Sequence, residues 1–533
     1  MFLIHNFYFI NTFIINSLLK NIKMDLRELT TKIVVELEND SEAKLIDKDA
    51  VATARTTISF KSVDSDKVDD ETAKRLLKRL INPGHLTPFL NRNLVYNLDG
   101  VSRTGSTWLH HLSRYYNSGH SSQRYLKLSK KDEMPKLHIP NSFLEGSPEI
   151  QEKVLNFLEK CHSNYLLIQD LFGSYLFENN LVEDFEAGKK VTTQYARDIF
   201  PGGVIGPIKF TTNIIQLGRL FILANNPSFE MPEDIRIVLI KMWALASVSA
   251  PNTTSAVKSA FESFIPPEIE MFKELDSKKS YDFYDKLWDE NSNDVKLVYS
   301  NISFAERFNR ELKILGINKN LEESNELHSK LDDIFFRNSF GIHNSTPIGQ
   351  AFMNLSGLGI YTKMSHSHLE QSARHRGITH NVNLILPLLS KSPRFLIPYP
   401  FKENEEIITI FKKTFDEFWQ LKDYLLEKNI SLWDISFLLP RGAEYLVSMT
   451  GNWGDWRHYL NLRTCSSAQF HINVNSVKIL NEFKKLDPYL PKIGPKCLFT
   501  EFCPEGPRSC GLFPWKNENG LNGVIKDRTK KGF

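Results

Sequence analysis

The stretch SHSHLEQSARHRGITHNVNL, residues 365–384, decides how the rest of the chain is interpreted. It places Gln371, Arg374, His375 and Arg376 within six consecutive positions. Two guanidinium groups only one residue apart repel each other, which favours a site where a bound anion neutralises both. Phosphate suits the planar guanidinium fork better than it suits lysine. A solvated basic turn is the alternative interpretation of such a charged triplet.

The local spacing predicts a short helix over 368–376. Ser367 with Glu370 three residues later is typical of a capping box, and Gly377 is a typical helix stop. The glutamine, the first arginine and the histidine would then share one helix face, because positions i, i+3 and i+4 are neighbours on a helix.

The string Gln371, two residues, Arg374, His375, Arg376 resembles the signature of the flavin-dependent thymidylate synthases. In that family the arginine-histidine-arginine triplet holds FAD, and the upstream glutamine and first arginine contact dUMP. The resemblance therefore implies FAD binding by the triplet and nucleotide binding by Gln371 and Arg374.

Composition indicates a globular chain. The 533 residues leave room for about two to four domains, and a hydrophobic content of 41% is ample for buried cores. Lys and Arg number 66 against 63 Asp and Glu, a net charge of +3 that does not favour a nucleic acid or a membrane surface as partner. Five cysteines, an odd number, argue for a reducing compartment and against a disulfide framework.

Residues 1–23 form an apolar leader that we interpret as an upstream extension or a disordered tail. No positive charge precedes the apolar run and no small-residue cleavage site follows it, so a signal peptide is not favoured. Asn6, Asn11 and Asn16 interrupt the run, which argues against a membrane span. We expect a cytoplasmic protein.

Residues 83–126 resemble the same family in a first copy of its domain. The alternation in 91–101 predicts a strand, and 104–116 a helix that follows it. The matched positions are Gly84, His85, Thr87 and Phe89, then Gly100 to Arg103, then Ser122, Arg124 and Tyr125. The resemblance implies cofactor contacts from His85 and Thr87, and nucleotide contacts from Ser122, Gln123 and Arg124.

This first copy lacks the triplet, because its expected place holds His111, Leu112 and Ser113, or Arg114, Tyr115 and Tyr116 if the helix is shifted. Farther along, Ala196 and Arg197 match an alanine-arginine pair of the family, which implies that Arg197 contacts the nucleotide. Ala224, eleven residues after Asn213, stands where the family has a catalytic arginine. Helices are predicted over 69–81, 232–248 and 253–264.

The second copy carries the triplet and a second matching stretch from Asp434. Asn452 and His458 occupy FAD positions, and Arg463 follows Asn452 by eleven residues, at the catalytic, nucleotide-contacting position. Other positions of this copy depart from the family. Leu384 and Leu386 replace the closing serine and arginine, and Ile435 and Ser436 replace the alanine-arginine pair.

The losses in the two copies are complementary. In the family, as the resemblance implies, one subunit gives the triplet, the glutamine and the late arginine to an active site that its neighbour completes. The chain is therefore expected to be an α+β protein with two tandem thymidylate synthase-like domains that share one site. The predicted division is 1–23 leader, 24–264 first domain, 265–294 linker, 295–490 second domain and 491–533 tail.

The resemblance implies reductive methylation of dUMP to dTMP through FAD, with NADPH and methylenetetrahydrofolate as co-substrates and no cysteine nucleophile. Arg124 and Arg197 would bind the phosphate, and Arg463 would stabilise negative charge on the pyrimidine as N3 ionises. A homodimer would assemble four domains. Two alternatives stay open: a flavoenzyme for another pyrimidine nucleotide, because His120 alters the pocket, and a non-catalytic flavin-binding or nucleotide-binding homologue.

The tail contains Cys497, Cys503 and Cys510 among Gly and Pro residues. Three thiols separated by five and six residues are able to ligate zinc if a fourth ligand comes from elsewhere. The spacing differs from paired Cys-x-x-Cys knuckles, so buried or free thiols are the favoured interpretation and no metal is assigned.

Overall fold

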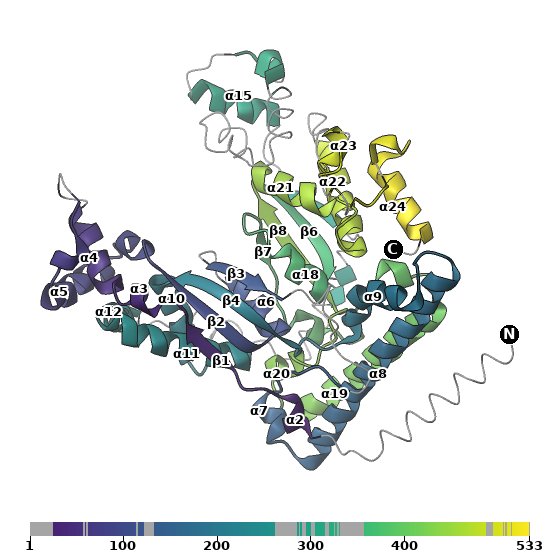
Figure 1. The fold of residues 1–533 in the computed structure, drawn as a ribbon, viewed down its shortest axis with the longest axis horizontal. Coiled ribbons are helices and arrows are strands. Elements are labelled where there is room, and N and C mark those ends of the chain that lie inside the picture. Colours follow the sequence, from purple (N-terminus) through teal and green to yellow (C-terminus); the bar gives the residue numbers. More distant parts are fainter. Residues whose placement is uncertain are drawn as a thin grey trace.

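Two four-stranded antiparallel sheets with packed helices organise the chain in the computed structural model (Figure 1). The structure describes residues 25–56, 59, 62–112, 116–121, 133–261, 285–286, 288–289, 295–299, 304–314, 319–324, 326–327, 330, 357–486, 494–500, 502–504, 506, 509–512 and 514–531. The predicted leader, 1–23, lies outside these residues. In the part of the chain that the structure describes, no helix is both long enough and apolar enough to span a bilayer.

The first sheet has the strand order β1-β2-β4-β3. Its strands are β1 (Val34–Leu37), β2 (Asn93–Ser102), β3 (Tyr116–His120) and β4 (Ile205–Asn213). Leu94 and Tyr96 of β2 are fully buried on one face, as alternation in a half-buried strand requires. The Tyr96 hydroxyl donates to the carbonyl of Met242, 3.1 Å away, which ties the sheet to a covering helix.

Helices surround this sheet. They are α2 (Leu26–Leu29), α3 (Asp40–Ala43), α4 (Ile46–Thr56), η2 (Ser65–Lys67), α5 (Asp70–Ile81), η3 (Thr87–Leu90), α6 (Arg103–Leu112), α7 (Asn141–Leu144), α8 (Pro148–Glu178), α9 (Phe185–Ala196), η4 (Arg197–Ile199), α10 (Ile214–Asn225), α11 (Glu233–Ser249) and α12 (Pro251–Phe261). The helices predicted over 69–81, 232–248 and 253–264 correspond to α5, α11 and α12.

The second sheet repeats the first with the order β5-β6-β8-β7. Its strands are β5 (Val295–Tyr299), β6 (Leu358–Ser365), β7 (Thr379–Asn381) and β8 (Glu444–Gly451). The other elements are α15 (Phe304–Ile314), α18 (His366–Ser372), η7 (Leu386–Leu389), η8 (Tyr399–Phe401), α19 (Glu405–Glu427), α20 (Leu432–Ser436), α21 (Trp453–Arg463), α22 (Phe470–Leu486), α23 (Cys497–Thr500), η10 (Pro514–Lys516) and α24 (Gly520–Lys531). The α+β class and the duplication are thereby confirmed.

The two copies meet along a short antiparallel pairing with Pro201 opposite Pro440. Equivalent residues of the two copies make equivalent bonds. Gly202 N donates to Leu439 O (2.9 Å) as Arg441 N donates to Phe200 O (2.8 Å), and Gly203 N donates to Phe437 O as Gly442 N donates to Asp198 O, both at 2.7 Å. This exchange of identical contacts is the pattern of a twofold axis within one chain.

Two long helices, α8 and α19, run side by side across this junction (Figure 1). Phe157 packs on Phe418 with ring centroids 5.7 Å apart, and Phe172 packs on Phe401 at 4.9 Å. Such aromatic pairs add to the stabilisation that burial already gives. The hydrophobic cores of the two copies are therefore continuous.

The predicted linker and tail both have described residues that pack on the second copy. Trp288 is fully buried, and its indole nitrogen donates to Glu444 Oε1 at 2.9 Å. In the tail, Arg528 of α24 donates to Asn473 Oδ1 at 3.1 Å and lies over the ring of Phe470. The predicted domain boundaries remain predictions.

The predicted helix over 368–376 is wrong in its extent. Helix α18 covers His366–Ser372, and its N-cap is Ser365, whose hydroxyl accepts from His368 N at 3.3 Å. Strand β6 runs directly into this helix, so the cap lies two residues earlier than the capping-box pattern indicates. The triplet consequently lies in the turn after the helix.

Replacing Gly203 by alanine should destabilise the junction between the copies. A Cβ there would lie 2.9 Å from Phe437 O and 3.0 Å from His138 O, and both obstacles are backbone. Overpacking of this kind costs about 1–3 kcal/mol. We expect a lower thermal unfolding midpoint for Gly203→Ala than for Gly119→Ala, where a Cβ meets nothing within 4 Å. Equal unfolding midpoints for the two variants would contradict the close backbone packing at Gly203.

Candidate functional site

The triplet presents two exposed arginines on either side of a buried histidine. Arg374 and Arg376 are exposed, whereas His375 is 7% exposed. Helix α18 ends at Ser372, so the triplet lies in a turn. In this turn the two arginines point outward and the histidine points inward. Both cationic side chains therefore lie at the surface.

Arg463, at the end of α21, hydrogen-bonds to the buried histidine of the triplet. Its Nε donates to His375 Nε2 at 2.9 Å, and its Nη2 donates to Gln371 O at 3.0 Å. Because a guanidinium only donates, His375 Nε2 must be unprotonated and the ring proton must sit on Nδ1. Burial, followed by the charge of Arg463, lowers the pKa of His375 to about 2, so the imidazole is neutral.

Gln469 joins the two copies at the site. Its Oε1 accepts from Gln371 Nε2 and from Arg197 Nη2, each at 2.7 Å, and its Nε2 donates to Gln194 O at 2.8 Å. Arg197 belongs to the first copy and Gln371 to the second. A continuous hydrogen-bonded chain therefore runs from Arg197 to Arg463 through buried groups.

A second contact between the copies links the triplet to β3. Arg376 Nη1 hydrogen-bonds to Asn117 Oδ1. Asn117 pairs with Thr211 of β4, which in turn pairs with Val95 of β2. Directly paired residues point to the same side of a sheet, so these three side chains share the face opposite the buried Leu94.

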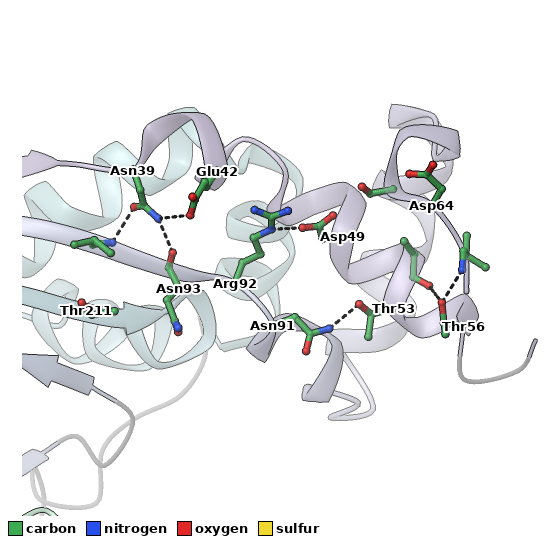
Figure 2. A pocket seen from close by; sticks show the side chains of 14 residues that line it. Asn39, Glu42, Asp49, Thr53, Thr56, Asp64, Asn91, Arg92, Asn93 and Thr211 are labelled. Carbon is green, nitrogen blue, oxygen red and sulfur yellow. Dashed lines mark hydrogen bonds and ion pairs between the residues drawn. The ribbon is translucent and has the colours of Figure 1, made fainter. Parts of the chain in front are cut away.

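A polar cavity of about 940 Å³ opens on this same face, next to Thr211 (Figure 2). It is lined by Asn39, Glu42, Asp49, Ala52, Thr53, Thr56, Val63, Asp64, Ser65, Asn91, Arg92, Asn93, Val95 and Thr211. Asn91 Nδ2 donates to Thr53 Oγ1 at 2.7 Å, and Arg92 forms an ion pair with Asp49. The cavity and the triplet thus lie along one open face of the first sheet.

A pair of histidines lies at the end of β3. His110 Nε2 is 2.8 Å from His120 Nε2 and 3.0 Å from Ser118 Oγ. At least one of the two facing Nε2 atoms must be unprotonated for the rings to share a hydrogen bond. Burial, then the nearby charge of Arg103, lowers the pKa of His120 to about 3, and Arg374 also lowers it. His120 is therefore an uncharged group beside the triplet.

The structure brings together most of the predicted site residues. Arg197, Gln371, His375 and Arg463 form one network, and Arg374 and Arg376 border it. On α21, His458 has its ring centroid 5.5 Å from that of His375. Asn452 caps α21, its side chain accepting from Asp455 N at 2.9 Å, just as Asn213 caps α10 in the first copy.

His85 and Thr87 are placed elsewhere. Both are exposed at η3, which leads into Asn91 and Arg92 of the cavity and packs on α4 at the far end of the first copy from α18 (Figure 1). Ser122, Gln123 and Arg124 lie outside the described residues.

Sequence reasoning missed several residues of the site. Asn117 and Gln469 were not singled out, and Glu370 was interpreted as a helix cap, although it pairs with Arg441 at 2.6 Å. For Gln469 a signal was available, since it ends an Ala-Gln pair six residues after Arg463. Asn117 carries no local signal.

The five cysteines, all of them described, form no disulfide; Cys497 is buried, Cys503 half-buried and Cys510 exposed. Within the described ranges no three His, Cys, Asp or Glu side chains are grouped in a way that would hold a metal ion.

The fold and the site define a class: an α+β protein of two tandem copies, with a polar site assembled across the boundary between them. Sequence comparison agrees, because the family model described as "Thymidylate synthase complementing protein" matches residues 41–252 and 349–489, one segment in each copy. The chain belongs to this family.

Known relatives point the same way. A flavin-dependent thymidylate synthase of Thermococcus onnurineus is 32% identical over 117 residues, 21% of this chain and 48% of that protein. The enzyme of the same name from Pyrococcus furiosus is 28% identical over 144 residues, 26% of this chain and 56% of that protein. The chain thus spans about half the length of the curated relatives it matches.

Asp198, next to Arg197, should make stability depend on pH. Burial raises its pKa to about 6, although Arg197 and a hydrogen bond from Ser367 oppose the shift. A raised folded-state pKa gives stability that is present at low pH and lost as pH rises from about 4, near the ordinary value, through about 6. As pH rises through that window, the free energy of unfolding of the wild-type protein should therefore fall relative to that of Asp198→Asn.

Urea unfolding at a series of pH values measures this difference. Asp69, an exposed cap of α5 whose pKa is lowered by the bond from Thr72 N, provides a control of opposite sign. The stabilisation that Asp69 provides should be lost as pH falls below the ordinary pKa of a carboxyl group. A pH-independent difference between the wild-type protein and Asp198→Asn would contradict the assignment.

Proposed function

We propose that the protein is a flavin-dependent thymidylate synthase that converts dUMP to dTMP with FAD, NADPH and methylenetetrahydrofolate. The single observation that carries the proposal is the network through Gln469, which puts Arg197 of one copy beside Gln371 and Arg463 of the other. These are the residues that each copy retained where the other copy lost its equivalent. A site decaying at random has no reason to keep complementary halves in contact.

The residues present fit a flavin dinucleotide. Arg374 and Arg376 would neutralise phosphate or ring charge. Arg463 donates to Nε2 of His375, so the proton on Nδ1 takes no part in that hydrogen bond. The polar cavity on the same sheet face offers amide and hydroxyl groups for the other end of the cofactor. When bound, the flavin supplies the redox chemistry of the reaction.

For the nucleotide, the chain provides cations from both copies. Arg197, with Ser122, Gln123 and Arg124, would bind dUMP phosphate, and Gln371 would orient the base. Arg463 would stabilise negative charge on the pyrimidine as N3 gives up its proton, which makes C5 nucleophilic. The buried position of Arg197 strengthens such a contact because water competes less.

One site per chain is proposed, since the pseudo-equivalent site has lost its groups. Trp108, which replaces the glutamine in the first copy, is buried in the core, and Thr104 contacts the carbonyl of Ser436, which replaces the arginine. A homodimer, with four domains, would then contain two sites. His85 and Thr87 would contribute to cofactor binding at the cavity end of the face.

The purified protein should bind one FAD per chain, and Arg374→Ala should lose it. The reason is the loss of a cation that the dinucleotide needs beside a neutral histidine. Flavin absorbance after gel filtration measures the bound fraction. Arg219→Ala, which removes an exposed arginine on α10, is the matched control and should stay yellow. Colourless wild-type protein that takes up no added FAD would refute the proposal.

Arg463→Ala should reduce turnover more than dUMP affinity, by about 10²–10³-fold in kcat, because it acts on charge that develops during the reaction. Arg197→Ala should instead weaken dUMP binding by about 1.5–3 kcal/mol, the scale of a charge-assisted hydrogen bond. Oxidation of NADPH that depends on dUMP, together with titration of dUMP, separates the two effects. Wild-type kinetics in both variants would be incompatible with a shared site.

A further inference from the structure

A largely buried carboxylate at the junction has not yet been given a role. Glu370 precedes Gln371 on α18, and its Oε2 lies 2.6 Å from Arg441 Nη2. The side chain of Arg441 is fully buried, and its backbone belongs to the pairing between the copies. Burial would raise the pKa of Glu370, but the charges of Arg441 and Arg103 outweigh it and hold the pKa at about 2. The group is an anion at every physiological pH.

The second cation near this carboxylate comes from the other copy. Arg103 begins α6, is 5% exposed, and its Nη2 donates to Ser121 O at 3.1 Å and lies 3.4 Å from Ser121 Oγ. Burial lowers the pKa of Arg103 to about 10, and the charge of Glu370 is the principal effect that opposes this. Ser121 directly precedes the segment Ser122 to Arg124. Arg103 therefore feels the charge of Glu370 and hydrogen-bonds to the backbone that leads into the predicted phosphate-binding residues.

Comparison of the two copies shows that this pairing of an arginine with a glutamate is specific to one side. Ser102 and Ser365 end equivalent strands, so Arg103 corresponds to His366 and Thr107 corresponds to Glu370. On the other side of the pseudo-twofold axis, Thr107 Oγ1 and His366 Nε2 lie 3.0 Å apart. The charged version lies next to Gln371 and Ser121, and the neutral version lies next to Trp108, where the glutamine is lost. The charge thus accompanies the retained site.

We propose that Glu370 is a positioning residue for the nucleotide site, an inference that rests on the proposed function. It neutralises Arg441 and Arg103 together, and so holds the end of β3 in register with the triplet segment. Without the carboxylate, two buried guanidinium groups would repel each other. Arg103 would then draw away from Ser121, and the end of β3 would lose its position relative to the triplet segment.

The test compares Glu370→Gln with Glu417→Gln in the full chain. Glu417 of α19 pairs with Lys160 of α8, so the control also removes a carboxylate that bridges the two copies, but at an exposed position far along the helices. Hydrogen exchange of residues 116–121 is followed in the protein without dUMP. We expect exchange there to be about tenfold faster in Glu370→Gln and unchanged in Glu417→Gln, as local opening requires.

Kinetics provide a second readout that a purely structural role would not move. Glu370→Gln should raise KM for dUMP by about tenfold or more with a much smaller effect on kcat, because it disturbs binding of the phosphate end. Glu370→Asp keeps the charge and should recover most of the wild-type KM, which also guards against failure of the glutamine variant to fold. In a double-mutant cycle, Arg103→Gln should add little to Glu370→Gln.

The outcomes are distinguishable. Wild-type exchange at 116–121 together with wild-type KM in Glu370→Gln would overturn the positioning role. An equal loss in Glu417→Gln would also overturn it, since the effect would then be general loosening of the junction. Wild-type protein that turns over no dUMP would remove the proposed function, while the exchange comparison would still decide whether Glu370 orders this segment.

Discussion

The antiparallel pairing of residues 198–203 with 437–442 is the constraint on which the structure depends. Four backbone hydrogen bonds, exchanged between equivalent residues, fix the two copies at one register and one angle. A strand pairing shifted by one residue would turn every side chain to the opposite side. Arg197 directly precedes this segment, and its distance from Gln469 in the other copy is set by it. The location of the site is therefore a consequence of backbone geometry.

Around this pairing, the molecule buries an unusual number of charges. Arg103, Arg197 and Arg441 are all at most 5% exposed, and Asp198 is 2% exposed. Desolvation of such groups is costly, and a buried ion pair gives little net stability compared with well-packed apolar residues. What it gives is discrimination, since a charge placed opposite the wrong partner costs far more. The buried charges at the junction thus define the arrangement of its polar groups, at a cost in stability.

How far the sequence predicts this structure depends on whether the signal is local. Strand and helix periodicity predicted β2, α5, α11 and α12, and the recurrence of one family's motifs at two places predicted the repeat. The extent of α18 was missed because Ser365 and Ser367 are both capable caps, and the strand before the helix decides between them.

Other parts of the site depend on contacts distant in sequence. Gln469 meets Arg197 across 272 positions, and Asn117 meets Arg376 across 259. Neither residue has a neighbour in the chain that indicates its partner. Glu370 shows the same limit, because its spacing from Ser367 is compatible with a cap while the buried Arg441 provides a stronger partner. Tertiary electrostatics overrode a local preference there.

The separation of the two halves of the site along the chain has a consequence for synthesis. Arg197 leaves the ribosome 272 residues ahead of Gln469. At about 5–20 residues per second, roughly 15–55 s pass before the partner exists. During that interval the first copy exposes the backbone edge at 198–203 and the apolar side of α8 that α19 later covers. A nascent chain in this state carries a vacant pairing edge, and neighbouring ribosomes on the same message present identical ones.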